Sequence, residues 1–361
     1  MRIMKNKKMQ KMSKATRSSL ITYGIVIAIF IIMQAMVSMN MMSSLMKGLL
    51  VPLCIYSVVA IGLNLCVGYL GELSLGHAGF MCVGAFASAF FTKYMVDSPM
   101  NETLRFFLAM LVGIAAAALS GYLIGIPVLR LRGDYLAIVT LAFGEIIKNV
   151  INVLYIGKDS HGLHLSIKDE ASLGMGEDGT MLINGARGIT GMHRQSTFMI
   201  GIILILISLV ICYNLVNSRS GRAVMAIRDN RIAAESVGIN ITRYKLMVFT
   251  ISAAIAGAGG VLYAHNLATL TATPTNFGYN MSIMILVYVV LGGMGSFRGS
   301  IIAAMLLTML PELLRGFSEY RMLIYAVVLI AMMLFNWAPA AIEMRERFVS
   351  KLPFGKKKEA V

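Results

Sequence analysis

The chain has 361 residues, of which 58% are hydrophobic and 14% charged, with a mean hydropathy of +0.76. Because soluble chains carry about 25% charged residues, this composition excludes a soluble enzyme, a secreted disulfide-stapled domain and a disordered chain. The net charge of +15 comes largely from basic residues that flank apolar runs, which indicates membrane lipid, and no nucleic acid, as the partner of those charges.

Ten apolar runs follow one another along the chain, at residues 20–37, 48–69, 75–91, 106–129, 135–156, 197–216, 246–264, 281–295, 300–314 and 322–337. Each is predicted to be helical, because backbone exposed to lipid must satisfy its own hydrogen bonds. We therefore predict an all-α, polytopic integral membrane protein with about ten transmembrane helices. Three runs, 75–91, 281–295 and 300–314, are short, and a re-entrant pair formed by the last two would lower the count to eight.

Lysine and arginine are distributed unevenly across this ten-span arrangement, with 22 on one side, nine on the other and one inside a span. By the positive-inside rule, the basic tails 1–19 and 339–361 are both cytoplasmic, and residues 20–338 form a single transmembrane domain. The first run is predicted to be an uncleaved span. The glycine-rich segment 157–196 is expected to be an irregular extracytoplasmic loop, and the segment 217–245 to be cytoplasmic.

The cytoplasmic segment has the pattern of one amphipathic helix. Ser220 is a suitable N-cap and Gly238 a suitable left-handed stop. The apolar residues between them fall near one face: Val224, Ile227, Ala234 and Val237. Such a helix either lies on lipid headgroups or inserts into a groove of a soluble partner, and the pattern alone does not separate the two.

Polar side chains within the apolar runs are the candidates for a substrate path, since they usually face a cavity or a partner. Glu145 and Lys148 share a helix face, so they either lock helices together as a neutralised pair or line a path through the bundle. The glycine-rich link around Ser74 is either a broken helix exposed to substrate or a locally satisfied turn. The full set of candidates is Asn64, Glu72, Ser74, His77, Thr140, Glu145 and Lys148.

Glycines mark positions of close packing or of a hinge. Gly121 and Gly125 lie one turn apart and are predicted to pack against another helix. Gly292, Gly293 and Gly295 interrupt the last third of the chain, where packing and hinge motion are both compatible with the pattern.

The sequence contains none of the common catalytic or nucleotide-binding motifs. No phosphate-binding loop, metalloprotease motif or nucleophile elbow occurs, and the four cysteines all lie inside apolar runs. The pair His161 and His164 has no cysteine partner, so no metal site is expected. We expect no cofactor bound by this chain, and energy must come from another subunit or from an ion gradient.

Several blocks of the sequence resemble a known family of membrane proteins. Ala233-Ala234-Glu235 followed by Gly238 resembles the E-A-A-x-x-x-G signature of ABC importer permeases. The blocks LNLCVGYLGELSLGHAGF, RGDYLAIVTLAFGEI, GRAVMAIRDNRIAAESVGINITRYKLMVF and LVYVVLGGMGSFRG resemble the branched-chain amino acid permease family, closer to its LivM-type than to its LivH-type subunit. They span about residues 63–299, while the outer loop departs from the family pattern apart from NGARGITG at 184–191.

The resemblance implies a non-catalytic subunit that couples to ATPases through Arg222, Ala226, Arg228, Asp229, Ala233, Ala234, Glu235 and Gly238. It further implies a LivH-type permease partner, two cytoplasmic ATPase subunits that bind ATP and Mg, an extracytoplasmic substrate-binding protein and a prokaryotic plasma (inner) membrane location. The family also contains permeases for urea and short amides, which is one alternative. A proton-coupled secondary transporter that uses Glu145 or His77 is another, and a membrane scaffold is a third.

Overall fold

The computed structural model describes residues 14–96, 99–131, 133–160, 162–176, 179–314 and 320–337. The tail 339–361, most of the tail 1–19, Arg132 and His161 lie outside the described residues. Of the predicted N-terminal tail, residues 14–19 belong to the first helix, which begins earlier than the apolar run does.

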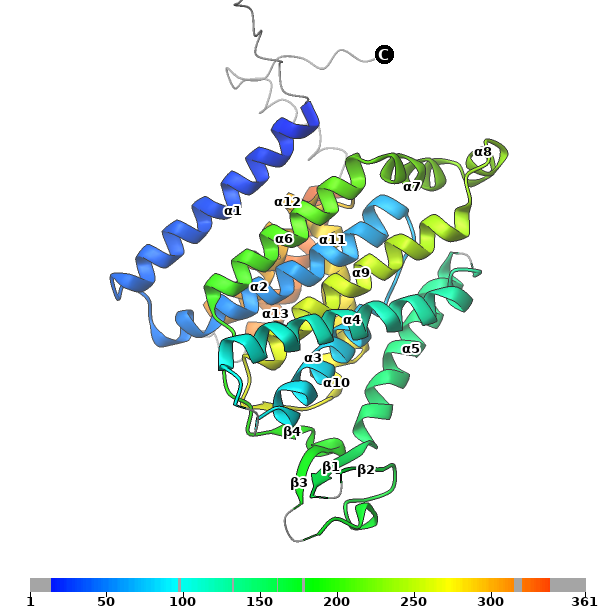
Figure 1. The fold of residues 1–361 in the computed structure, drawn as a ribbon. Helices are drawn as coiled ribbons and strands as arrows, with labels where there is room; N and C mark the ends of the chain where they lie inside the picture. The colour runs from blue at the N-terminus through cyan, green and yellow to red at the C-terminus, as the bar shows by residue number, and fades with distance from the viewer. Residues whose placement is uncertain are drawn as a thin grey trace, which may run out of the picture.

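Each of the ten predicted runs coincides with a helix in the structure (Figure 1). These helices are α1 (Lys14–Ser38), α2 (Ser44–Asn64), α3 (His77–Tyr94), α4 (Glu102–Val128), α5 (Asp134–Asn152), α6 (Phe198–Asn217), α9 (Ile241–Ala264), α11 (Tyr279–Gly292), α12 (Phe297–Leu313) and α13 (Arg321–Trp337). Within the described residues, six spans are long and apolar enough to cross a membrane: α1, α2 with its continuation, α4, α6, α9 and the segment 274–292. The multi-pass architecture is therefore confirmed, whereas the count of ten crossings stays a prediction.

Helices α2 and α9 form the centre of the bundle, and 89% and 67% of their most apolar stretches are buried. Small residues on α9 allow this packing. A β-carbon on Gly259 would lie 2.4 Å from the Val59 side chain of α2, and one on Gly257 would lie 2.2 Å from the β-carbon of Ala117 on α4. Because lipid removes the hydrophobic force between helices, close backbone approach through small residues supplies much of their attraction.

The helices alternate in direction between two ends, which we call the α7 end and the sheet end. Thr22 near the start of α1 hydrogen-bonds Tyr213 near the end of α6 over 2.9 Å, while Phe30 contacts Phe198 at the other end of α6. Gly125 near the end of α4 packs on Leu246 near the start of α9. This alternation agrees with the predicted arrangement, and the assignment of the α7 end to the cytoplasm stays a prediction.

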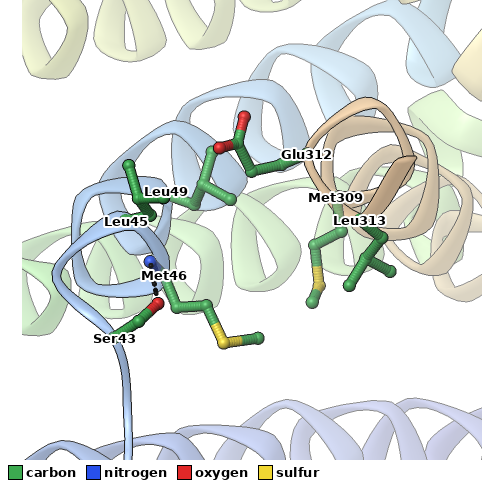
Figure 2. A pocket seen from close by; sticks show the side chains of 7 residues that line it. All are labelled: Ser43, Leu45, Met46, Leu49, Met309, Glu312 and Leu313. Atoms are coloured by element: carbon green, nitrogen blue, oxygen red, sulfur yellow. Dashed lines mark hydrogen bonds between the residues drawn. The ribbon is translucent and has the colours of Figure 1, made fainter. Parts of the chain in front are cut away.

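Helices α11 and α12 run in opposite directions between the two ends. Arg298 at the start of α12 hydrogen-bonds Thr22 at the α7 end. The far end of α12 faces the start of α2 at the sheet end, where a groove of about 380 Å³ opens between them (Figure 2). The groove is lined by Ser43, Leu45, Met46, Leu49, Met309, Glu312 and Leu313. Helix α12 is not among the six apolar spans of the described residues, so two crossings and a re-entrant pair both stay predictions.

The predicted irregular outer loop contains strands, so the all-α prediction is wrong for this segment. Strands β1 (Tyr155–Asp159), β2 (Gly162–Ser166) and β3 (Thr180–Asn184) form an antiparallel sheet in the order β2-β1-β3. A second pair joins β4 (Ile189–Thr190) to β5 (Thr269–Leu270), and short helical turns lie at Ala171–Leu173 (η2) and Gly185–Arg187 (η3). Helix α5 ends at Asn152, so the last residues of the predicted run 135–156 belong to β1.

The predicted single inner helix is two helices, α7 (Arg219–Asp229) and α8 (Arg231–Ser236). Asn230 separates them, because its extended backbone (φ −154°) ends α7 and its side chain accepts a hydrogen bond from the Ala233 amide, which caps α8. The N-cap of α7 is Ser218 rather than the predicted Ser220. Gly238 ends the segment with φ +84°, as predicted.

Candidate functional site

The link between α2 and α3 is a break in the helix at the α7 end. Helix α2 continues as a π-helical turn, η1 (Leu65–Leu70), which Gly71 ends with φ +77°. The chain is then non-helical until α3 begins at His77. Helix α5 presses on this link, since a β-carbon on Gly76 would lie 2.4 Å from the Thr140 carbonyl oxygen. The link is thus non-helical and packed against α5, and its exposure to substrate stays a prediction.

His77 lies at the centre of a buried hydrogen-bond network. Its Nε2 is 2.7 Å from the Ser252 hydroxyl, which itself donates to the Gly62 carbonyl, so Ser252 accepts from Nε2–H. Its Nδ1 is 3.2 Å from the Ser74 hydroxyl. The imidazole is completely buried, and none of the contacts described for it is to a carboxylate. Through these hydrogen bonds the ring joins α3 to the link and to α9, and Ser252 continues the network to α2.

Glu72 in the same link forms an ion pair with Lys245 of α9. The exposed fractions of the two side chains are 15% and 4%, so the pair is largely removed from water. Sequence reasoning counted Lys245 only as a cytoplasmic charge and missed this contact, which joins residues 173 positions apart. The predicted topology, which puts both residues at the inner ends of spans, is the signal that would have suggested it.

Helix α5 contributes a hydroxyl group and an ion pair on the side that faces the bundle. The Thr140 hydroxyl accepts from the Leu75 amide over 3.0 Å, which fixes the link against α5. Glu145 forms an ion pair with Lys148, whose side chain is 7% exposed, and accepts a hydrogen bond of 2.7 Å from the Tyr279 amide at the start of α11. Both predicted partners are therefore paired with each other, and Glu145 also caps α11.

An apolar groove of about 380 Å³ lies between α3 and α5. Its lining is apolar throughout and comes from Val83, Phe86, Ala87 and Phe90 of α3, from Ile146, Ile147, Val150 and Ile151 of α5, and from Leu154 and Ile183. The α5 residues adjoin Glu145 and Lys148 in the sequence.

Asn64 lies on another side of the link and connects α2 to the loop between α11 and α12. Its Oδ1 accepts from the Gly295 amide over 2.8 Å, and its Nδ2 donates to the Ser300 hydroxyl over 2.7 Å. Gly293 and Gly295 adopt φ +93° and +80°, which accounts for the tight loop. A β-carbon on Gly292 would lie 2.3 Å from the Gly299 carbonyl carbon, so this glycine permits close packing of α11 on α12.

The predicted packing glycines of α4 face α9. A β-carbon on Gly121 would lie 2.4 Å from the β-carbon of Ala253, and one on Gly125 would lie 2.7 Å from Leu246. The substrate-path candidates thus lie in or near the α2–α3 link and along α5. Gly121 and Gly125 lie elsewhere, in the interface between α4 and α9.

The predicted coupling residues are all on α7, α8 and the turn that follows. Ile227 and Ala234 pack with Ile241 in a small apolar cluster that fixes the two helices to the start of α9. Ile232 of α8 and Val237 directly after it are 82% and 75% exposed, so this end of the segment presents apolar side chains to its surroundings. The predicted shared face that included Val237 is wrong, because the break at Asn230 turns Val237 outward.

Among the charged coupling candidates, Arg228 makes the contact that reaches the bundle. Its Nη1 donates to the Gly68 carbonyl over 3.0 Å, and its Nε and Nη2 donate to Asp229. Arg222 donates to the Asn217 carbonyl at the end of α6. Ala226 packs beside the cluster of Ile227, and Ala233 and Glu235 are exposed.

Comparison with known proteins gives consistent matches over most of the chain. Residues 45–335 match the family model described as the branched-chain amino acid transport system permease component. The high-affinity branched-chain amino acid transport system permease protein LivM of Salmonella typhimurium is 37% identical over 314 residues, which cover 84% of this chain and 71% of that protein. LivM of Escherichia coli is 36% identical over 310 residues, which cover 83% and 70%.

A second kind of permease from the same transport system also matches. The permease protein LivH of Salmonella typhimurium is 22% identical over 293 residues, which cover 77% of this chain and 88% of that protein. No solved structure matches the chain significantly.

Proposed function

This chain belongs to the branched-chain amino acid transport system permease family, and on that premise we propose that it is the translocating subunit of an ABC importer for branched-chain or related apolar amino acids. It is a multi-pass inner-membrane protein. The identity to LivM supports the substrate class, and the lower identity to LivH supports pairing with a second, homologous permease.

The observation that carries the substrate proposal is the apolar groove between α3 and α5, whose lining residues Ile146 and Ile147 lie between the ion-paired Glu145 and Lys148 in the sequence. A free amino acid has an ammonium and a carboxylate, which these two side chains match in charge. The groove suits an apolar side chain, because its lining offers no competing polar group. Urea and short amides lack both the charges and the side chain that this arrangement would bind.

The observation that carries the coupling proposal is the exposed apolar surface of α8. A short helix that lies on lipid headgroups needs a continuous apolar face, but α7 and α8 are broken at Asn230 and direct Ile227 and Ala234 toward α9. Ile232 and Val237 are left exposed. We infer that they fill a groove on an ATPase subunit, which binds the ATP and Mg, and that this chain is a non-catalytic part of the complex.

Uptake by the complete transporter tests both the substrate proposal and the coupling proposal. The tagged chain is extracted gently from its membrane, its co-purifying subunits are identified by mass spectrometry, and the complex is reconstituted in proteoliposomes with the extracytoplasmic binding protein. We expect two ATPases and a second permease, and leucine uptake that follows ATP hydrolysis and persists when a protonophore collapses the proton gradient. Recovery of this chain alone, with uptake that needs the gradient, would overturn the importer proposal.

A pair of variants on one helix tests the groove. Ile146→Phe narrows it, and we expect the KM for leucine to rise about tenfold, a change typical of crowding an apolar pocket. Ile138→Phe is the matched control, because Ile138 lies two turns earlier on the exposed side of α5 and outside the groove lining. Equal effects of the two variants would contradict the groove as the site of the substrate side chain.

A further inference from the structure

The carbonyl oxygen of Gly68 has an unusual position at the end of a helix. It belongs to the last turn of η1, where carbonyls have no amide further along the helix to accept from. The Nη1 of Arg228 donates to it over 3.0 Å, so a cation from α7 satisfies the negative end of the helix. The aliphatic part of Arg228 also covers Gly71, where a β-carbon would lie 2.7 Å from the arginine Cγ.

Gly68 also touches the loop between α11 and α12. A β-carbon on Gly68 would lie 2.0 Å from the Asn64 Oδ1 and 2.2 Å from the Gly295 amide nitrogen. These two atoms are themselves hydrogen-bonded to each other over 2.8 Å. Gly68 is thus held between the guanidinium of α7 and the glycine loop, with no side chain of its own to absorb a displacement.

A second contact joins the same two elements. The ring of Tyr69, next to Gly68, stacks on Phe297 at the start of α12 with a centroid distance of 4.8 Å. A displacement of η1 therefore moves both sides of the loop, at Gly295 and at Phe297. In a closely packed region, such shifts are transmitted through direct atomic contacts like these two.

The ion pair with Asp229 does not explain why the Arg228 side chain is held against the bundle. The two side chains are 39% and 66% exposed, and exposed pairs contribute little to stability. The contact that orders the guanidinium against the bundle is the one to Gly68. An arginine is suited to this role because its planar group donates to the carbonyl and to Asp229 together.

We propose that Arg228 is the positioning residue that transmits the displacement of α7 through the Gly68 carbonyl to the α11–α12 loop. This inference rests on the proposed function, because it assigns a route to the motion that the ATPases supply. Arg228 thereby acts inward, on the permease itself, and is not required to contact the ATPase.

Hydrogen exchange on the complete, reconstituted transporter tests this route together with uptake. Exchange of peptides covering residues 219–229 and 291–300 is compared with and without ATP trapped by vanadate, and leucine uptake is measured per ATP hydrolysed. In Arg228→Ala we expect α7 to respond to ATP as in the wild type, the loop response to be lost, and uptake per ATP to fall about tenfold, the effect of one charge-assisted hydrogen bond.

Two further variants sharpen the comparison. Arg228→Lys keeps the charge but cannot donate to both partners, so an intermediate loss is expected. Arg219→Ala is the control, because Arg219 is an exposed arginine at the start of the same helix and is not among the coupling candidates. It is expected to keep the wild-type ratio of uptake to hydrolysis.

The outcomes separate the two proposals. If neither α7 nor uptake responds to ATP in the wild type, the importer function fails. If both respond, and Arg228→Ala keeps the loop response and the wild-type ratio of uptake to hydrolysis, the importer stands and the role of Arg228 is wrong. An Arg219→Ala loss equal to that of Arg228→Ala would also overturn it, since charge on α7 would then suffice.

Discussion

Two buried lysines of the helical bundle each form an ion pair, one with a residue a helical turn away and one with a residue far away in the sequence. Lys148 pairs with Glu145 on α5, whereas Lys245 pairs with Glu72 across the interface between α9 and the α2–α3 link. Sequence spacing predicts the first pair and not the second. An ammonium group removed from water needs such a partner, so removal of either carboxylate leaves a buried charge without compensation.

Glu72→Gln is expected to destabilise the chain by about 3 kcal/mol, because it leaves Lys245 buried and unpaired. The double variant Glu72→Gln/Lys245→Met should recover most of this loss. Unfolding in detergent can be followed with a thiol-reactive dye, since all four cysteines are buried in the native structure. Equal stability of Glu72→Gln and the exposed control Glu235→Gln would contradict the structural role of the pair.

His265, directly after α9, gives a stability that depends on pH. Burial lowers the pKa of His265 below its usual range, and the positive charge of Arg105 lowers it further, against the opposing effect of the hydrogen bond to the Val261 carbonyl. Below about pH 6.5 the unfolded chain therefore binds a proton that the folded chain resists, so the free energy of unfolding decreases as the pH falls.

The His265→Gln variant should lose part of this pH dependence. Unfolding midpoints of the wild type and the variant, measured at about pH 7.5 and about pH 5.5, give the difference that belongs to His265. If the wild type and the variant lose the same stability on acidification, His265 does not contribute to the pH dependence of the unfolding free energy.

At the scale of elements, the ends of helices were less predictable than their existence. The stop at Gly238 follows from a glycine in the left-handed region, which the sequence displays directly. The break at Asn230 was missed, because the apolar spacing continues across it and only the capping preference of asparagine signals a new start. Helix interiors were predictable from apolar runs, while contacts between α9 and its neighbours depend on glycines whose partners no local pattern identifies.

Gly84→Ala is expected to destabilise the bundle, since the new β-carbon would lie 2.4 Å from the Gly257 carbonyl oxygen and would separate α3 from α9. Gly48→Ala is the matched control, because Gly48 is also inside a helix but has open space at that position. Alanine there should be neutral or stabilising by up to about 1 kcal/mol. Thermal unfolding of the two variants checks this, and equal losses would contradict the packing argument.

Across the whole molecule, the apolar runs predicted the helices of the bundle, whereas the orientation from the charge counts and the coupling role of residues 217–245 stay predictions. The small sheet was not predicted, because strands of five residues in a glycine-rich segment have no regular alternation long enough to recognise. Among the site candidates, the residues of the α2–α3 link were predicted to lie together from their proximity in sequence. Their contacts with Ser252, Lys245 and Gly295 are long-range and follow only from the packing of the helices.

The orientation of the molecule can be tested with single cysteines at its two ends. Ser160→Cys lies beside β1 at the sheet end, and Ser236→Cys lies at the end of α8. Because the native cysteines are buried, background labelling is low. A membrane-impermeant maleimide added to intact cells should label position 160 and should reach position 236 only after permeabilisation. The opposite pattern would invert the predicted topology.

Within the bundle, Arg228 donates to a backbone atom, the carbonyl oxygen of Gly68, and this limits which mutations can compensate for its loss. A carbonyl oxygen is present whichever residue occupies position 68, so no codon change there can restore a lost guanidinium by supplying a complementary side chain. Selection for revertants of an Arg228 variant should therefore yield true reversion or changes elsewhere on α7 and the α11–α12 loop. Compensating pairs between positions 228 and 68 should be missing from such a collection, although the two residues are in direct contact.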